Sequence, residues 1–141
     1  MFYKCTLLLI IFMALLSGCS DKDSSTSPAI VFNWEGTFTV SNGYGTIEIE
    51  MPDPLPNGDF TAEIKWEDED GDYGEGTMQF TKTGDSIIGG GNTSLSQPGY
   101  SVTINFVTGT ISENEQRIEG NFSMTVGESS DTGTYILTKK G

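Results

Sequence analysis

The sequence predicts an all-β domain, an up-and-down antiparallel meander of about eight strands that closes into a small barrel. Apolar and polar residues alternate with a period of two repeatedly from Val31 onward, and no window there keeps the 3.6-residue period of an amphipathic helix. Pairs that favour tight turns, such as Asn42-Gly43 and Asp70-Gly71, separate the alternating windows. A β-sandwich is the alternative, but closure is favoured because it leaves no unpaired strand edge.

Each alternating window predicts one strand that packs an apolar face on the core and turns a Thr- or Glu-rich face to water. The short turns predict that each strand pairs with the next one along the chain. The run Gly89-Gly90-Gly91 indicates a bulge or a strand break. The windows cover residues 34–40, 47–51, 60–66, 78–80, a vaguer stretch around 87–88, 102–106, 118–126 and 134–139.

The first eighteen residues have the pattern of a secretory signal peptide. Lys4 supplies an early positive charge, residues 7–16 form an apolar run, and the small residues Ser17 and Gly18 follow. Because a membrane-spanning helix needs about 20 apolar residues, this run is too short to cross a bilayer. The pattern predicts a signal peptide over residues 1–18 that is removed from the mature protein.

The residues Leu16-Ser17-Gly18-Cys19 resemble the lipobox of bacterial lipoproteins. The resemblance implies that Cys19 receives a diacylglycerol, that the chain is cut before it, and that the new N-terminus is acylated with a fatty acid such as palmitate. It implies a membrane partner through this anchor, and Ser20 in place of Asp resembles the outer-membrane sorting signal. Whether the protein then faces the periplasm or the cell surface stays open. Residues 19–30 are expected to be the lipidated cysteine and a flexible linker, and residues 31–141 the barrel domain.

Three short motifs inside the predicted barrel carry a second resemblance. Trp34-Glu35-Gly36, Ile118-Glu119-Gly120 and the closing run from Gly133 to Thr138 are similar to the lipocalin-like and avidin-like barrels of bacterial lipoproteins. This resemblance implies a barrel that binds a small ligand.

The composition excludes several classes of function. The chain has 20 acidic and 7 basic side chains, a formal net charge of -13, and no histidine. The absence of histidine excludes Ser/His/Asp and Cys/His catalysis, and the negative charge disfavours nucleic acid as a partner. Of the two cysteines, Cys5 lies in the signal peptide and Cys19 is the expected lipid attachment, so no disulfide is predicted. We therefore expect no enzymatic activity and no cofactor.

The apolar alternation predicts aromatic residues that point into the barrel, with glycines at 36, 76 and 120 leaving space beside them. This arrangement favours a pocket for a small apolar ligand, with Trp34 as the floor. The alternative is a filled barrel that serves as an envelope interaction module, such as an assembly subunit or an inhibitor, and presents loops including residues 94–100. A protein partner cannot be named from the sequence. The candidate ligand-binding residues are Trp34, Phe38, Phe60, Trp66, Phe80, Phe106 and Phe122.

An acidic run over residues 67–75 lies at a predicted hairpin tip. Asp68, Asp70 and Asp72 are candidate Ca²⁺ ligands because Ca²⁺ prefers carboxylate oxygens on a glycine-containing turn. The register of an EF-hand loop fails, since placing Gly71 at the sixth position places Trp66 at the first. The favoured interpretation is a charged turn that keeps the end of a sheet soluble without any ion.

Overall fold

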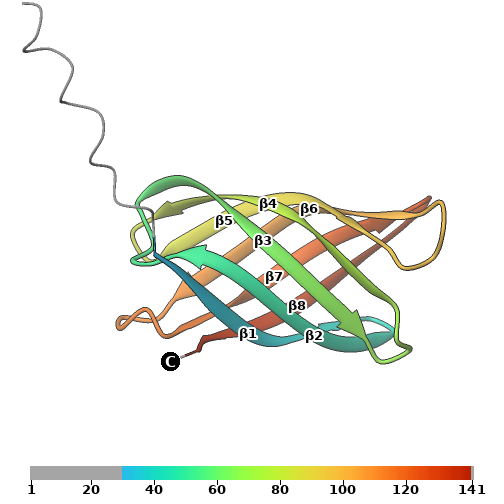
Figure 1. Ribbon diagram of the computed structural model, residues 1–141, viewed down its shortest axis with the longest axis horizontal. Helices are drawn as coiled ribbons and strands as arrows, with labels where there is room; N and C mark the ends of the chain where they lie inside the picture. Colours follow the sequence, from blue (N-terminus) through green and yellow to red (C-terminus); the bar gives the residue numbers. More distant parts are fainter. Residues whose placement is uncertain (1–29, 141) are drawn as a thin grey trace, which may run out of the picture.

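A computed structural model describes residues 30–140 of the chain, and eight antiparallel strands make up most of that part (Figure 1). The vague fifth window is a full strand, and the last strand begins five residues earlier than its alternating window. The strands are β1 (Val31–Val40), β2 (Gly43–Pro52), β3 (Gly58–Asp68), β4 (Tyr73–Thr83), β5 (Ser86–Ser94), β6 (Ser101–Ile111), β7 (Arg117–Val126) and β8 (Ser129–Lys139).

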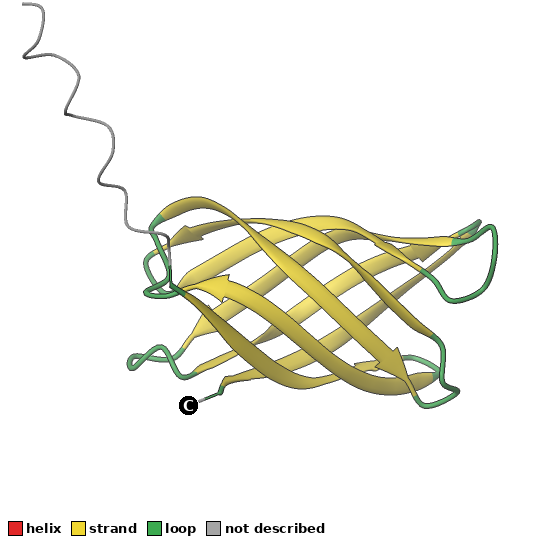
Figure 2. Cartoon of the chain, viewed as in Figure 1, coloured by secondary structure: helices red, strands yellow, loops and turns green. Residues whose placement is uncertain are grey.

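Each strand pairs with the next in sequence, and β8 pairs back with β1 to close the barrel (Figure 2). The closing register runs from Trp34 opposite Lys139 to Val40 opposite Gly133. The predicted closed meander is therefore confirmed, and the sandwich alternative is wrong. Residues 30–140 contain no helix that could cross a membrane.

The predictions for the N-terminus fall on a part of the chain that is not described. The signal peptide over 1–18, the lipidation of Cys19 and the linker up to residue 29 all lie outside residues 30–140, as does Gly141. The first strand begins at Val31, where the barrel domain was expected to begin.

Most apolar side chains of the strands point into the barrel, and the charged ones point out. In β2, for example, Ile47, Ile49 and Met51 are buried, whereas Glu48 and Glu50 between them are exposed. Barrels that span membranes show the opposite arrangement, with an apolar band on the outer surface. The outer wall of this barrel is therefore built to face water.

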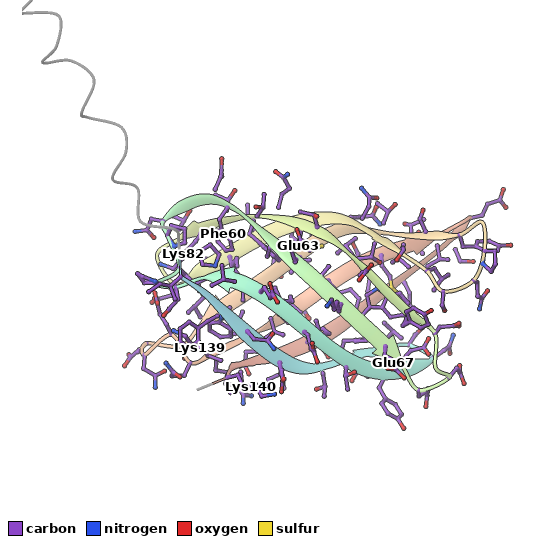
Figure 3. The ribbon with its side chains drawn as sticks, in the orientation of Figure 1. Phe60, Glu63, Glu67, Lys82, Lys139 and Lys140 are labelled. Carbon is purple, nitrogen blue, oxygen red and sulfur yellow. The ribbon has the colours of Figure 1, made fainter. Side chains whose placement is uncertain are left out.

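The two ends of the barrel differ. We call the end where β1 begins the closed end, because Trp34 and Met51 are each only 1% exposed there and Leu55, from the β2–β3 loop, is buried with them. Lys139 forms an ion pair with Asp53 at this end, and its Nζ lies 4.7 Å from the centre of the Phe32 ring. Figure 3 shows Lys82, Lys139 and Lys140 at this end and Glu67 at the other. We call the other end, formed by the β1–β2, β3–β4, β5–β6 and β7–β8 loops, the mouth.

The inward glycines have a different role from the one predicted. A Cβ at Gly36 would lie 1.7 Å from the carbonyl oxygen of Ile136, and one at Gly120 would lie 1.8 Å from that of Thr108. These glycines therefore let neighbouring strands approach and bend, and the space that they leave is filled by backbone rather than by a ligand.

A second set of glycines accommodates aromatic rings. Four rings lie over the glycine that faces them on the next strand, where a Cβ would come within 2.4 to 2.7 Å of a ring atom. The rings are thereby held against the wall of the barrel, which leaves the middle of the lumen open. The pairs are Phe38 with Gly45, Trp66 with Gly74, Phe80 with Gly89, and Phe122 with Gly133.

One extra residue in β6, Asn105, interrupts the regular ladder of β5, β6 and β7. Against β5 it shifts the register between Gly89 and Gly91, so the irregularity predicted at the triple glycine is present, but the extra residue lies on the facing strand. Against β7 it shifts the register between Ile104 and Phe106. This bulge reverses the in–out alternation, so that Phe106 is 52% exposed on the outer wall. The prediction that Phe106 points inward is therefore wrong.

The substitution Gly45→Ala should destabilise the barrel by about 1–3 kcal/mol, because the added methyl overpacks a filled site. Its Cβ would lie 2.2 Å from the Glu67 carbonyl oxygen and 2.5 Å from the Phe38 ring. Urea unfolding followed by circular dichroism measures the loss. The matched control is Gly43→Ala, whose Cβ would lie close only to the flexible end of Glu69, at 2.8 Å, and in ordinary contact with Val40, at 4.0 Å. Equal stability of the two variants would contradict the packing described.

Candidate functional site

A cavity of about 370 Å³ runs through the barrel and reaches the surface at the mouth. Its volume lies in the range of small-molecule binding sites, about 300–1,000 Å³. All eight strands contribute to its wall, whereas the loops of the closed end do not. Side chains therefore do not fill the interior. The alternative to a pocket, a filled barrel, would require that they do.

Four of the seven predicted ligand-binding residues line the cavity: Phe38, Trp66, Phe80 and Phe122. Trp34 and Phe60 are buried but do not line it, and Phe106 lies outside the barrel. Trp34 thus lies at the closed end, the position expected for the predicted floor of the pocket. Trp66 is the tryptophan that lines the cavity.

Sequence reasoning missed several residues of the wall. Tyr135 and Leu137 point inward from β8, and the alternation of the last window was the signal that could have placed them there. Leu95 and Gln97 come from the β5–β6 loop, where no periodicity indicates direction. The aliphatic and thioether residues of the wall are Val40, Ile47, Ile49, Met51, Ile64, Met78, Ile87, Leu95, Val102, Ile104, Val107, Ile118, Met124, Val126 and Leu137.

Three aromatic rings from strands that are not neighbours meet inside the barrel. The ring centre of Phe38 lies 6.4 Å from that of Trp66 and 6.2 Å from that of Phe122, with interplanar angles of 85° and 81°. Edge-to-face pairs of this kind contribute about 0.5–1.5 kcal/mol each beyond the burial of their area. The three rings give one part of the wall a rigid aromatic surface.

Below the mouth, the polar groups of the wall are already hydrogen-bonded. Trp66 Nε1 donates to Thr93 Oγ1 at 2.9 Å, and the Tyr135 hydroxyl donates to the Thr108 carbonyl oxygen at 2.9 Å. Burial raises the pKa of Tyr135, so its hydroxyl stays protonated and remains a donor. Within residues 30–140, the buried side-chain atoms without a partner are Asn33 Oδ1 and Trp34 Nε1, and neither residue lines the cavity. The inner wall therefore presents an almost entirely apolar surface.

The β3–β4 turn holds the β5–β6 loop in place at the mouth. The carboxylate of Asp72 accepts hydrogen bonds from Ser96 Oγ at 3.0 Å and from Gln97 Nε2 at 2.9 Å. The Tyr73 backbone amide also donates to Ser96 Oγ, at 3.2 Å. These bonds fix the loop from which Leu95 reaches the cavity.

The acidic run forms the predicted hairpin tip, the turn between β3 and β4. Asp68 Oδ1 accepts the backbone amides of Asp70 and Asp72, at 3.0 and 2.9 Å, so this carboxylate stabilises its own turn. In the described part of the chain, no three acidic side chains are arranged to hold a metal ion. Calcium binding by Asp68, Asp70 and Asp72 stays a prediction, and the role of Asp68 in the turn accounts for its position without an ion.

The fold and the cavity define an eight-stranded up-and-down barrel with an open apolar lumen. Comparison with known protein families, with curated proteins and with solved structures gives no match to this chain. The resemblance to lipocalin-like and avidin-like barrels accordingly stays a prediction from the sequence.

The two tryptophans should differ in their access to a small polar quencher. Trp66 lines the open cavity and is half-buried, whereas Trp34 is 1% exposed at the closed end. The Trp34→Phe variant emits only from Trp66, and the Trp66→Phe variant emits only from Trp34. Acrylamide should quench the first variant several-fold more strongly than the second. Equal quenching constants would show that the mouth does not admit small molecules.

Proposed function

We propose that this protein is a non-enzymatic lipoprotein of the bacterial outer membrane whose barrel binds a small apolar ligand. The observation that carries the ligand proposal is the apolar cavity, which is closed at one end and open at the mouth. Eight strands enclose an interior that side chains can just fill, so an unfilled lumen needs a reason. Ligand binding supplies that reason.

The packing of the aromatic rings supports the proposal. Glycines opposite Phe38, Trp66, Phe80 and Phe122 let these rings lie against the wall instead of across the lumen. Because glycine within a strand lowers the stability of that strand, four such pairs would destabilise a barrel that only needed a filled core. They are well suited to a wall that surrounds another molecule.

The absence of catalysis is supported by the chemistry of the wall. The chain has no histidine, and the polar groups of the inner wall hydrogen-bond one another or the backbone. Glu48, Glu50 and Glu63 are exposed on the outer wall, where they cannot act on a molecule in the cavity. No pair of carboxylates faces the inside of the barrel below the mouth within residues 30–140.

The lipid anchor is supported by the sequence alone. The apolar run over residues 7–16 and the lipobox at Leu16 to Cys19 carry this part of the proposal. Residue 30 enters the barrel at the closed end, so the anchor attaches opposite the mouth. A ligand would then enter from the side of the barrel that is farther from the point of attachment.

Replacing the predicted lipid attachment should release the protein from the membrane. In a bacterial host, Cys19→Ser should move the protein from the membrane fraction to the soluble fraction and abolish incorporation of radiolabelled palmitate, because two or more acyl chains are needed for stable anchoring. The matched control is Cys5→Ser, because Cys5 lies in the predicted signal peptide. This substitution should change neither the membrane association nor the incorporation of palmitate. Palmitate labelling of the Cys19→Ser protein would contradict the anchor.

Filling the cavity should abolish binding of an apolar probe. Ile104 lines the cavity and is half-buried, so Ile104→Trp places a larger side chain in the lumen. The neutral dye N-phenyl-1-naphthylamine should bind the Cys19→Ser chain and lose most of its affinity for Ile104→Trp. Fluorescence titration measures both.

The matched control is Ile88→Trp, which makes the same change on the outer wall, where Ile88 is 51% exposed. Ile88→Trp should bind the dye with the same affinity as its parent, the Cys19→Ser protein. If the parent binds no dye, and protein purified from its own host yields no ligand on organic extraction, the proposed function is wrong and the envelope interaction module becomes the better hypothesis.

A further inference from the structure

The mouth of the cavity carries negative charge that no ion pair offsets. Six acidic residues lie in residues 67–75 and two more in 126–131, and the other two segments of the mouth, 40–44 and 94–101, have no charged residue. None of the four segments contains lysine or arginine. The ion pairs within residues 30–140 all lie outside these segments: Lys82–Glu115, Arg117–Glu119, Lys139–Asp53 and Lys140–Glu35.

Four of these carboxylates border the cavity itself, those of Asp68, Glu69, Asp70 and Asp72. Asp68 and Asp72 are held by hydrogen bonds within the β3–β4 turn and to the β5–β6 loop, so their charges are fixed at the rim. Glu69 and Asp70 are exposed, and no side-chain hydrogen bond or ion pair within residues 30–140 involves their carboxylates. Two acidic groups at the opening are therefore available to a molecule in the cavity.

Three exposed tyrosines lie at the mouth end of the barrel. Tyr44, Tyr73 and Tyr100 are 61%, 62% and 56% exposed, and they lie on or beside the β1–β2, β3–β4 and β5–β6 loops. Tyr44 also lines the cavity. Exposed aromatic faces next to carboxylates attract organic cations, since the negative ring face adds to the attraction of the charges.

Below the mouth, the cavity favours apolar groups over charged ones. Below the rim the wall is aliphatic and aromatic, and its polar groups, Trp66 Nε1 and the Tyr135 hydroxyl, already donate to protein atoms. A charged or strongly polar group placed there would lose its hydration without gaining a partner. The part of a ligand that enters the barrel must therefore be apolar.

We propose that the cavity binds an amphipathic cation, a molecule with an aliphatic or aromatic body and one ammonium or guanidinium group. The body lies among the rings of the lumen, and the cation lies at the mouth beside Glu69, Asp70 and Tyr44. This inference rests on the proposed function, since it requires that the cavity takes a small apolar molecule. The cavity defines the site, and the charge of its rim selects among apolar ligands.

Three probes with the same ten-carbon chain test the inference: decyltrimethylammonium, decanol and decanoate. Each probe is titrated by calorimetry, well below its micelle-forming concentration, into Cys19→Ser protein that begins at residue 19. All strand pairings of the barrel lie between residues 31 and 139, so this chain retains them. The ammonium should bind about tenfold more tightly than the alcohol, because the two uncompensated carboxylates at the mouth attract its charge. Decanoate should bind most weakly.

A pair of matched double variants locates the cation. Glu69→Gln with Asp70→Asn removes two charges at the mouth without removing a hydrogen bond of the fold. Glu48→Gln with Glu50→Gln removes two charges from the outer wall. The preference for ammonium over alcohol should fall to about twofold in the first variant and persist in the second. Ile104→Trp should abolish binding of all three probes.

Each other outcome overturns the inference in a recognisable way. Equal binding of the three probes, or tightest binding of decanoate, sinks the choice of ligand class but leaves the proposed function standing. Loss of the preference in both double variants means that the net charge of the whole protein, rather than the mouth, attracts the cation. If no probe binds, the proposed function and this inference fail together.

Discussion

The pairing of β1 with β8 is the constraint on which the rest of this structure depends. It removes the two free edges of the sheet and forces the strands to bend around a common axis. The bend brings the backbone of β8 so close to Gly36 that a Cβ would lie 1.7 Å from the Ile136 carbonyl oxygen. Closure therefore requires glycine at this point of the wall, and the inside of the barrel exists only because the wall closes.

The lumen stays open because of how closure and aromatic packing combine. A barrel of eight strands has an interior that large side chains can fill, and several aromatic rings point into this one. Four of these rings, those of Phe38, Trp66, Phe80 and Phe122, each lie over a glycine of the next strand, so their volume is taken up at the wall. Trp34 is buried at the closed end, and the cavity opens to the surface at the mouth.

The two ends of the barrel divide the charges between them. At the closed end, Lys82 and Lys139 (Figure 3) form ion pairs with carboxylates, and Leu55 is buried in the core. At the mouth, the carboxylates hold loops through hydrogen bonds to neutral groups, and their charges remain uncompensated. One end is thus closed by packing and ion pairs, whereas the other carries uncompensated negative charge around the opening of the cavity.

The sequence by itself determined the class of fold, the number of strands and their order, because alternation and turn residues act between near neighbours in the chain. It also located the acidic hairpin and four of the residues that line the cavity, Phe38, Trp66, Phe80 and Phe122. It placed Phe106 inside because the extra residue at Asn105 is visible only when β6 is counted against its neighbours β5 and β7. Local patterns cannot show such a mismatch between two strands.

Only the tertiary structure decided whether the barrel is hollow and where it opens. A cavity is the small difference between the volume that the wall encloses and the volume of the side chains inside it, and no local pattern reports that difference. The contribution of Leu95 and the position of the mouth depend on the bonds from Ser96 and Gln97 to Asp72, which lie more than twenty residues apart in the chain. The sequence specified which groups are apolar and which are charged, and closure of the sheet decided which of them face the same space.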